Sequence, residues 1–241
     1  MSRLLDDAAA AAATAAAAAA TAAVAGAGAG LLDRARVVRY SDQFDLGRGR
    51  AALFMPMYAR SLHQLEHKSR AAAPLPAVLL LHAARDVLRG LALMHAAGVA
   101  HCDVKADNVM FDSAGAATLI DLGAATPFGK PTRKGAPEDL ALGLSVARGS
   151  ASLDLACLAS TLWWASQRTE PPGGAGLSPA RLADVAERAA AASAAAAAAA
   201  GREGDGSATE VLSAIAAILR ADSAAAALNA LAGMRDVYST T

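Results

Sequence analysis

The fold of this chain is decided by the stretch His101-Cys-Asp-Val-Lys-Ala-Asp-Asn108, together with Ile120-Asp-Leu-Gly123 after it. The first part holds a carboxylate, an ammonium group and an amide, and a further carboxylate, Asp121, follows 13 residues after Asn108. A tight hairpin between the two parts would return Asp121 to the loop. Phosphoryl transfer requires a carboxylate that orients the attacking hydroxyl, oxygen ligands for Mg²⁺ and a cation for the developing charge. The stretch therefore predicts a phosphoryl-transfer site, whose amide and carboxylate leave Mg²⁺ open to phosphate and water.

The residues on either side of this loop have clear periodic patterns. Residues 76–97 carry leucine, valine and alanine at helical spacing and are followed by Gly98, which predicts a buried helix that ends there. Residues 108–111 and 117–120 are short apolar runs around the turn sequence Asp112-Ser-Ala-Gly115. This pattern predicts two strands joined by a turn.

The motif resembles the catalytic loop and the metal-binding loop of eukaryotic-type protein kinases. The family pattern H-R-D-L-K-x-x-N stands here as residues 101–108, and D-F-G stands as Asp121-Leu-Gly123. A lysine two residues after the aspartate resembles the serine/threonine branch. The resemblance implies Asp103 as the catalytic base, Lys105 as a contact to the transferred phosphate, and Asn108 and Asp121 as ligands of Mg²⁺.

The resemblance extends to a nucleotide-binding hinge. Residues 53–62 are similar to the fifth strand and hinge of the family, with Met55 at the gatekeeper position. The resemblance implies that ATP binds here: the adenine edge would use the carbonyl of Pro56 and the N–H of Tyr58. It also places Met110 at the nucleotide. Proline at position 56 loses only an N–H group, so the hinge remains able to bind ATP.

Similar matches continue toward the C-terminus. Ala136-Pro-Glu138 matches the A-P-E motif, and residues 154–165 resemble the central helix of the kinase C-lobe. The resemblance implies that Asp154 holds the backbone of the catalytic loop. The family's arginine partner of the A-P-E glutamate is replaced by alanine within residues 222–227, so Glu138 is expected to pair with Arg220 instead or to remain solvated. Further helices are expected over residues 182–200, 210–219 and 224–234. The expected fold is mainly α with small β elements (α+β), a protein kinase-like C-lobe with an incomplete N-lobe.

The N-terminal part lacks features that a competent kinase N-lobe supplies. No lysine precedes Lys68 and no glutamate precedes Glu66, so the usual ion pair of the N-lobe has no counterpart here, and no glycine-rich phosphate loop is found. Only residues 36–45 resemble a fourth strand. We expect an alanine-rich low-complexity segment over residues 1–30, a remnant of N-lobe strands and hinge over 31–58, and a helical C-lobe over 59–241, with a disordered connector near 190–208.

Composition restricts the class of protein. The chain has 241 residues, with 22 basic and 22 acidic side chains, so it has no net charge that would favour nucleic acid or acidic membranes as partners. The alanine run near the N-terminus is too weakly apolar to predict a membrane span. Cys102 and Cys157 favour a reducing, intracellular and cytoplasmic location over a disulfide. Cys102 is expected to be packed and unreactive. Because it replaces the arginine of the family motif, activity is expected not to depend on phosphorylation of Thr126 or Thr132.

Three functions remain open from the sequence. The first is a serine/threonine protein kinase that transfers the ATP γ-phosphate to a hydroxyl of a protein substrate. The second is a catalytically impaired pseudokinase or truncated kinase that acts as a binding module, in which a partner protein completes or replaces the N-lobe. The third is a small-molecule phosphotransferase, which the lysine after the base and the A-P-E match disfavour.

Overall fold

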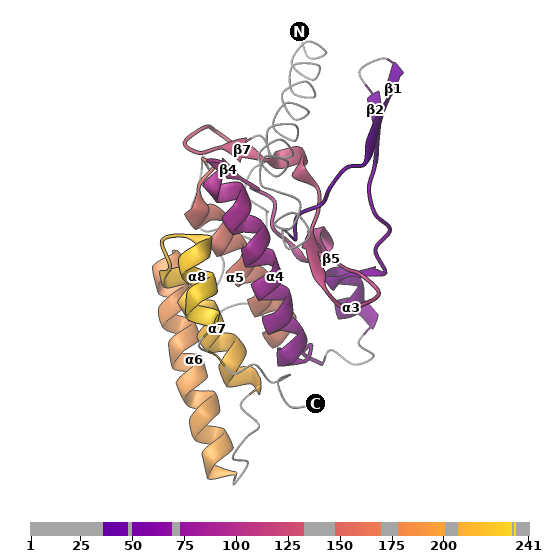
Figure 1. Cartoon of the computed structure of the whole chain (residues 1–241). Coiled ribbons are helices and arrows are strands. Elements are labelled where there is room, and N and C mark those ends of the chain that lie inside the picture. Colours follow the sequence, from indigo (N-terminus) through magenta and orange to yellow (C-terminus); the bar gives the residue numbers. More distant parts are fainter. Residues whose placement is uncertain are drawn as a thin grey trace.

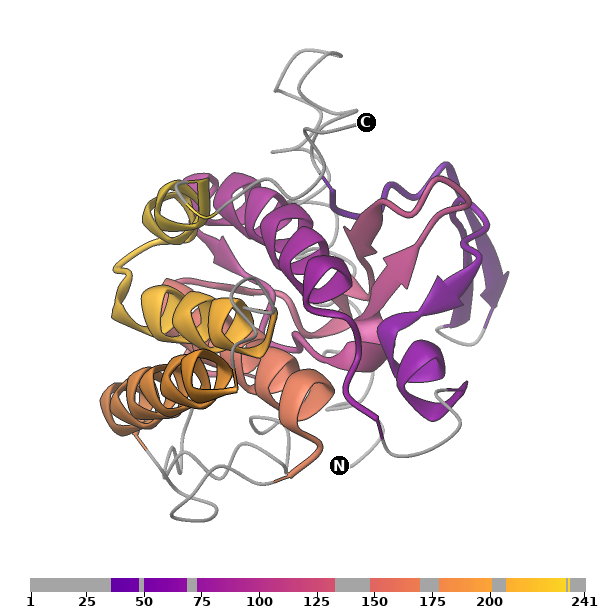
Figure 2. The same cartoon turned by 90° about the horizontal axis from the view of Figure 1, so that it is seen from below.

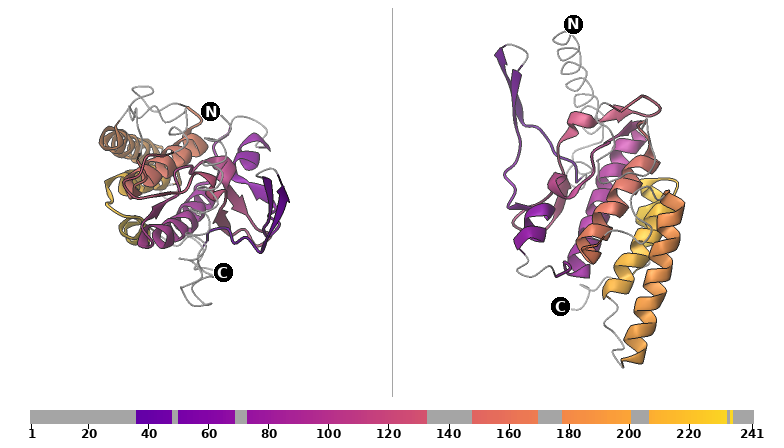
Figure 3. Two further views of the ribbon diagram at one scale, coloured as in Figure 1. Left: turned by 90° about the horizontal axis from the view of Figure 1, so that it is seen from above. Right: turned by 180° about the vertical axis from the view of Figure 1, so that it is seen from behind.

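The computed structural model describes residues 36–47, 50–68, 73–132, 148–169, 178–200, 207–232 and 234. The longer helices gather on one side of the molecule, and a β-hairpin with a short helix lies on the other (Figure 1). The strands that follow the catalytic loop lie between these two parts, as the views in Figures 2 and 3 also show. The alanine-rich residues 1–30 and the A-P-E match at 136–138 lie outside the described residues.

The helical part is built around two largely buried helices, α4 (Ala77–Ala96) and α5 (Ala151–Gln167). The other helices of this part are α6 (Pro179–Ala199), α7 (Ser207–Arg220) and α8 (Ala224–Ala232). Helix α5 begins at Ser150, whose hydroxyl accepts the N–H of Leu153, and it is buried on nearly every face. The largest fully buried side chains include Leu88 of α4, Leu158 of α5 and Ile215 of α7. The predicted helix over residues 76–97 is confirmed, and Gly98 follows it with a positive φ of 72°.

The strands are short and form separate sheets. They are β1 (Asp42–Gly47), β2 (Arg50–Phe54), β3 (Arg60–Ser61), β4 (Val99–Ala100), β5 (Val109–Phe111), β6 (Ala117–Leu119) and β7 (Thr126–Pro127). Strands β1 and β2 form an antiparallel hairpin, β3, β5 and β6 form a sheet in that order, and β4 pairs with β7. The short helix α3 (Leu62–Lys68) follows β3 directly. The predicted strand–turn–strand unit is therefore confirmed as β5 and β6.

The expected connector near 190–208 is wrong over its first half. Helix α6 continues to Ala199, and α7 begins at Ser207, so residues 190–199 are helical. Alanine is the best intrinsic helix former, and a run of alanine favours a helix although its composition is of low complexity. Within the described ranges, no helix is both long and apolar enough to cross a membrane.

The first described segment, Arg36–Tyr40, lies between α4 and β6. The N–H of Val38 donates to the carbonyl of Leu119 at 2.8 Å, and the N–H of Leu119 donates to the carbonyl of Arg36 at 2.9 Å. Gly90 of α4 allows this close approach, because a Cβ atom there would lie only 2.8 Å from the Arg36 carbonyl oxygen. The strand expected over residues 36–45 thus begins only at Asp42, and the residues before it contact the helical part instead.

Candidate active site

The catalytic loop brings three of the predicted site residues into direct contact. The carboxylate of Asp103 is buried, and the ammonium group of Lys105 lies 3.0 and 3.1 Å from its two oxygens. A 3₁₀ turn over Ala106–Asn108 returns the chain, so that the Nδ2 group of Asn108 donates to the backbone carbonyl of Asp103 at 2.8 Å and to its Oδ2 at 3.1 Å. The Asp103 side chain is therefore held in one orientation by a cation and an amide.

Asp121 lies next to this group at the ends of paired strands. The pairing of β5 with β6 continues as a hydrogen bond from the N–H of Ile120 to the carbonyl of Asn108 at 2.9 Å. Asp121 follows at once, in the left-handed conformation (φ 62°, ψ 77°), with its Oδ1 accepting the N–H of Gly123 at 3.1 Å. Its side chain is exposed. Because Asn108 also contacts Asp103, this hydrogen bond places the start of the Asp121 turn beside the catalytic loop.

The backbone of the loop is held from below by a buried carboxylate. Asp154 of α5 is fully buried; its Oδ2 accepts the N–H of His101 and its Oδ1 accepts the N–H of Cys102, each at 2.8 Å. The Nε2 atom of His95, from the last turn of α4, lies 2.8 Å from Oδ2. The role that the resemblance gave Asp154 is therefore confirmed, and His95 is a partner that the sequence did not indicate.

His101 is held as a neutral ring. Its Nε2 atom lies 3.0 Å from the carbonyl of Ile120, and its Nδ1 atom accepts the N–H of Asp103 at 3.3 Å. These partners require a proton on Nε2 and a lone pair on Nδ1. Burial lowers the pKa of His101, with the nearby carboxylates, Asp154 first, acting in the opposite direction. The ring thus links the catalytic loop to the strand that precedes Asp121.

The cysteine in the loop is packed, as the sequence predicted. Cys102 has a left-handed backbone (φ 62°) and is only 2% exposed. Burial raises the pKa of its thiol to about 12, and the charge of Asp154 contributes in the same direction. Burial also raises the pKa of Cys157 well above its ordinary value. Thr126, one of the two hydroxyls of the following loop, is buried and donates to the carbonyl of Ala124 at 2.9 Å.

The hinge residues lie at the edge of the β5 and β6 strands. The side chains of Met55 and Pro56, just after β2, are exposed. Tyr58 is half-buried, while Met110 lies on β5 opposite Ser61 of β3. The segment that carries Tyr58 leads into β3, which pairs with the strand that carries Met110. Met55 and Pro56 follow directly after β2, the second strand of the hairpin.

A tyrosine that the sequence did not indicate also contacts the metal loop. Tyr40 packs against the cluster that contains the buried side chain of Leu122. Burial raises the pKa of Tyr40, and the negative charge of Asp121 acts in the same direction. A tyrosine in an apolar run gives no local signal for this role.

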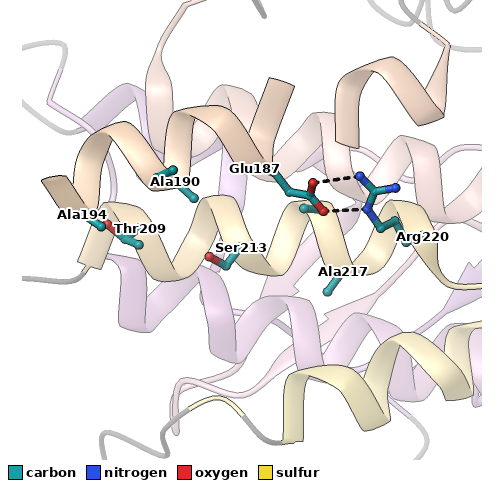
Figure 4. Close-up of a pocket in the computed structure, with 9 residues that line it drawn as sticks. Glu187, Ala190, Ala194, Thr209, Ser213, Ala217 and Arg220 are labelled. Carbon is teal, nitrogen blue, oxygen red and sulfur yellow. Dashed lines mark hydrogen bonds and ion pairs between the residues drawn. The ribbon is translucent and has the colours of Figure 1, made fainter. Parts of the chain in front are cut away.

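Arg220 is engaged elsewhere on the surface. It contacts Glu187 at 2.6 and 2.9 Å and Asp184 at 2.8 Å, all exposed on α6 and α7. This ion pair closes one end of a groove of about 450 Å³ between the two helices, lined mostly by alanine, serine and threonine (Figure 4). Arg220, the expected alternative partner of Glu138, thus already pairs with two other carboxylates, those of Glu187 and Asp184.

The donor set suits Mg²⁺ with a phosphate ligand. Because the Nδ2 group of Asn108 faces Asp103, the amide oxygen is the atom left to bind a metal, and the exposed Asp121 adds a carboxylate. Across the described ranges, no group of three or more His, Cys, Asp and Glu side chains is arranged to hold a metal on its own. Mg²⁺ commonly binds to one or two protein oxygens and completes its shell with phosphate and water, which fits this pair.

Comparison with known proteins agrees with this geometry. Residues 30–141 match the model of the protein kinase domain. Mitogen-activated protein kinase kinase kinase 17 of Arabidopsis thaliana is 46% identical over 41 residues, which are 17% of this chain and 11% of that protein.

The solved structure of vaccinia related kinase 3 shares the fold. It aligns with a TM-score of 0.51 and 19% identity, over 58% of this chain and 47% of that one. The chain thus spans about a tenth of the curated relative and about half of the solved kinase. The fold is a kinase-like C-lobe with a small β part, as the sequence predicted.

Proposed function

We propose that this kinase domain transfers the γ-phosphate of ATP to a serine or threonine hydroxyl of a protein. The observation that carries the proposal is the contact of Asp103 with both Lys105 and Asn108 in one buried group. A carboxylate held in this way is pre-oriented to accept a proton from an attacking hydroxyl. The lysine two residues after the base supports the serine/threonine branch.

Each side chain has a role that its position allows. Asp103 orients the substrate hydroxyl and takes its proton on a carboxylate oxygen. Lys105, whose side chain is 39% exposed, carries the cation that stabilises charge on the transferred group. Asn108 and Asp121 would hold Mg²⁺, and Mg²⁺–ATP supplies the phosphoryl group and charge neutralisation when bound. The hinge carbonyl of Pro56 and N–H of Tyr58 would hold the adenine edge, above Met110.

A second candidate is a catalytically impaired kinase-like binding module. It is favoured by one observation: no lysine precedes Lys68 and no glutamate precedes Glu66 in this sequence. That pair normally positions the triphosphate. The β1–β2 hairpin also leaves large apolar side chains exposed, including Phe44 at 51% and Phe54 at 53%. A partner protein that covers this hairpin would complete the small lobe. The two buried free thiols, Cys102 and Cys157, support a reducing, intracellular setting.

Titration with ATP, with and without Mg²⁺, distinguishes these candidates. The kinase proposal predicts Mg²⁺-dependent binding that weakens at least about tenfold in Asp121→Asn, because a charged ligand is lost. Asp184→Asn is the matched control, since it removes an exposed carboxylate on α6. Phosphate transfer to a serine peptide should then disappear in Asp103→Asn. Absence of nucleotide binding in the wild type would reject the kinase proposal and favour the binding module.

A further inference from the structure

Helix α3 carries two histidines one turn apart. His63 and His67 stand at positions i and i+4 of this helix, Leu62–Lys68, which lies on the hairpin side of the molecule (Figure 1). Side chains at this spacing share one face of a helix. The centroids of the two imidazole rings are 4.1 Å apart, and the ring planes are tilted by 52°. The two rings are therefore already gathered at one point of the helix surface.

The pair lies on the outer face of the helix. On the inner face, the side chain of Leu62 is 1% exposed and that of Leu65 packs against the core. His63 is half-buried and His67 is exposed. Ions in solution can therefore reach the rings, while the helix that carries them stays packed on the core.

The backbone of α3 is fixed near both ends. The N–H of Ser61 donates to Oε1 of Gln64 at 3.0 Å, and the N–H of Gln64 donates to the hydroxyl of Ser61 at 3.1 Å. This reciprocal pair is a capping box, which fixes the start of a helix. Near the other end, the guanidinium group of Arg168 donates to the carbonyl of Glu66 at 2.7 Å. The two histidines thus need little reordering to bind a common ligand.

Two imidazoles arranged in this way suit a transition metal. Imidazole nitrogen is a good ligand of Zn²⁺, Cu²⁺ and Ni²⁺, and two histidines at positions i and i+4 of a helix can bind one ion together. Glu66 stands on the same helix, but its Oε1 atom is buried. In the part of the chain that the structure describes, no group of three or more His, Cys, Asp and Glu side chains is arranged to hold a metal. The pair therefore offers two protein ligands, and water would complete the coordination shell.

We propose that His63 and His67 form a two-histidine binding site for a divalent transition-metal ion, of which Zn²⁺ is the first to test. The site is distinct from Asn108 and Asp121, whose oxygen atoms suit Mg²⁺, and it does not depend on the proposed kinase function. Helix α3 contacts the 3₁₀ turn at Ala106–Asn108. A bound ion would therefore stabilise the helix that lies against the catalytic loop.

Calorimetric titration of the full chain with Zn²⁺ at neutral pH, without nucleotide, is the first test. The affinity for Zn²⁺ should fall at least about tenfold in His63→Ala and in His67→Ala, because the helix holds the second imidazole at a high effective concentration. His82→Ala is the matched control, since it removes an exposed histidine of α4. It should leave the affinity for Zn²⁺ unchanged.

The ligands can be identified directly with Cu²⁺, even in the wild type alone. Electron paramagnetic resonance of the wild type with a single equivalent of Cu²⁺ should show splitting from two nitrogen ligands, reduced to one in either single variant. Circular dichroism without metal checks that the variants are folded. Unchanged Zn²⁺ affinity in both single variants overturns the proposal, as does an equal loss in His82→Ala. A copper signal without nitrogen ligands, or a wild type that binds no Zn²⁺, overturns it as well.

Discussion

Replacing Asp154 with asparagine should release the catalytic loop from the helical core. The two oxygens of this buried carboxylate accept the N–H groups of His101 and Cys102 at 2.8 Å, and Nε2 of His95 lies at the same distance from Oδ2. Asparagine keeps one oxygen and puts an NH₂ group in place of the other. Since an NH₂ group can donate hydrogen bonds but cannot accept them, one of the two backbone N–H groups loses its acceptor and faces another donor.

The magnitude follows from these contacts. A buried N–H left without an acceptor costs about 1–3 kcal/mol, and loss of the negative charge weakens the remaining bond by about 1 kcal/mol. We therefore expect Asp154→Asn to lower the free energy of unfolding by about 3 kcal/mol. For a chain of 241 residues this corresponds to a fall in Tm of about 6–12 °C.

The assay is thermal and urea unfolding followed by circular dichroism, with amide exchange of residues 101–103 as a local measure. Asp184→Asn is the control, because Asp184 is 53% exposed and its ion pair with Arg220 should contribute less than about 1 kcal/mol. A Tm for Asp154→Asn within about 2 °C of the wild type, less than 1 kcal/mol on the same scale, would refute the reasoning. So would unchanged exchange of the loop amides.

Three further predictions concern other parts of the chain. Iodoacetamide at pH 8 should modify neither cysteine of the folded protein, because burial raises the pKa of Cys102 to about 12 and that of Cys157 well above its ordinary value; labelling as fast as in urea would contradict this. Gly90→Ala should lower the free energy of unfolding by about 1–3 kcal/mol, since the added methyl would lie 2.8 Å from the Arg36 carbonyl oxygen; an unchanged urea midpoint would show that the segment moves aside. Arg220→Ala should change stability by less than about 1 kcal/mol because its ion pairs are exposed, and a loss above about 2 kcal/mol in urea unfolding would count against that view.

The site was predictable from sequence where short-range chemistry determines it. The turn between β5 and β6 is formed by Asp112, whose Oδ1 accepts the N–H groups of Ala114 and Ala116 at 2.9 Å. This is the local hydrogen bonding that makes aspartate favourable in turns. Because the turn fixes the hairpin, the distance along the chain from Asn108 to Asp121 was sufficient to predict that both lie at one end of it.

Contacts between distant segments were not predictable in this way. Tyr40 packs against the cluster that contains Leu122, 82 residues further along the chain, and Gly90 meets Arg36 because two elements cross. No periodic pattern in the sequence records either contact. The helix expected over residues 182–200 is confirmed as α6, because alanine favours helix by propensity, and only the connector expected to overlap it was wrong there.

The structure separates what holds the catalytic loop from what would hold the nucleotide. The loop is anchored by Asp154 of α5 and by His95 of α4, both in the helical part. The hinge at Met55 continues from a hairpin whose apolar side chains are exposed. A partner that covers the hairpin should therefore change nucleotide affinity without changing amide exchange in residues 101–103. Loss of the Asp154 carboxylate should first accelerate amide exchange in residues 101–103, before it changes nucleotide affinity, since Asp154 contacts the loop itself. The two perturbations thus act first on different parts of the same site, the nucleotide hinge and the catalytic loop.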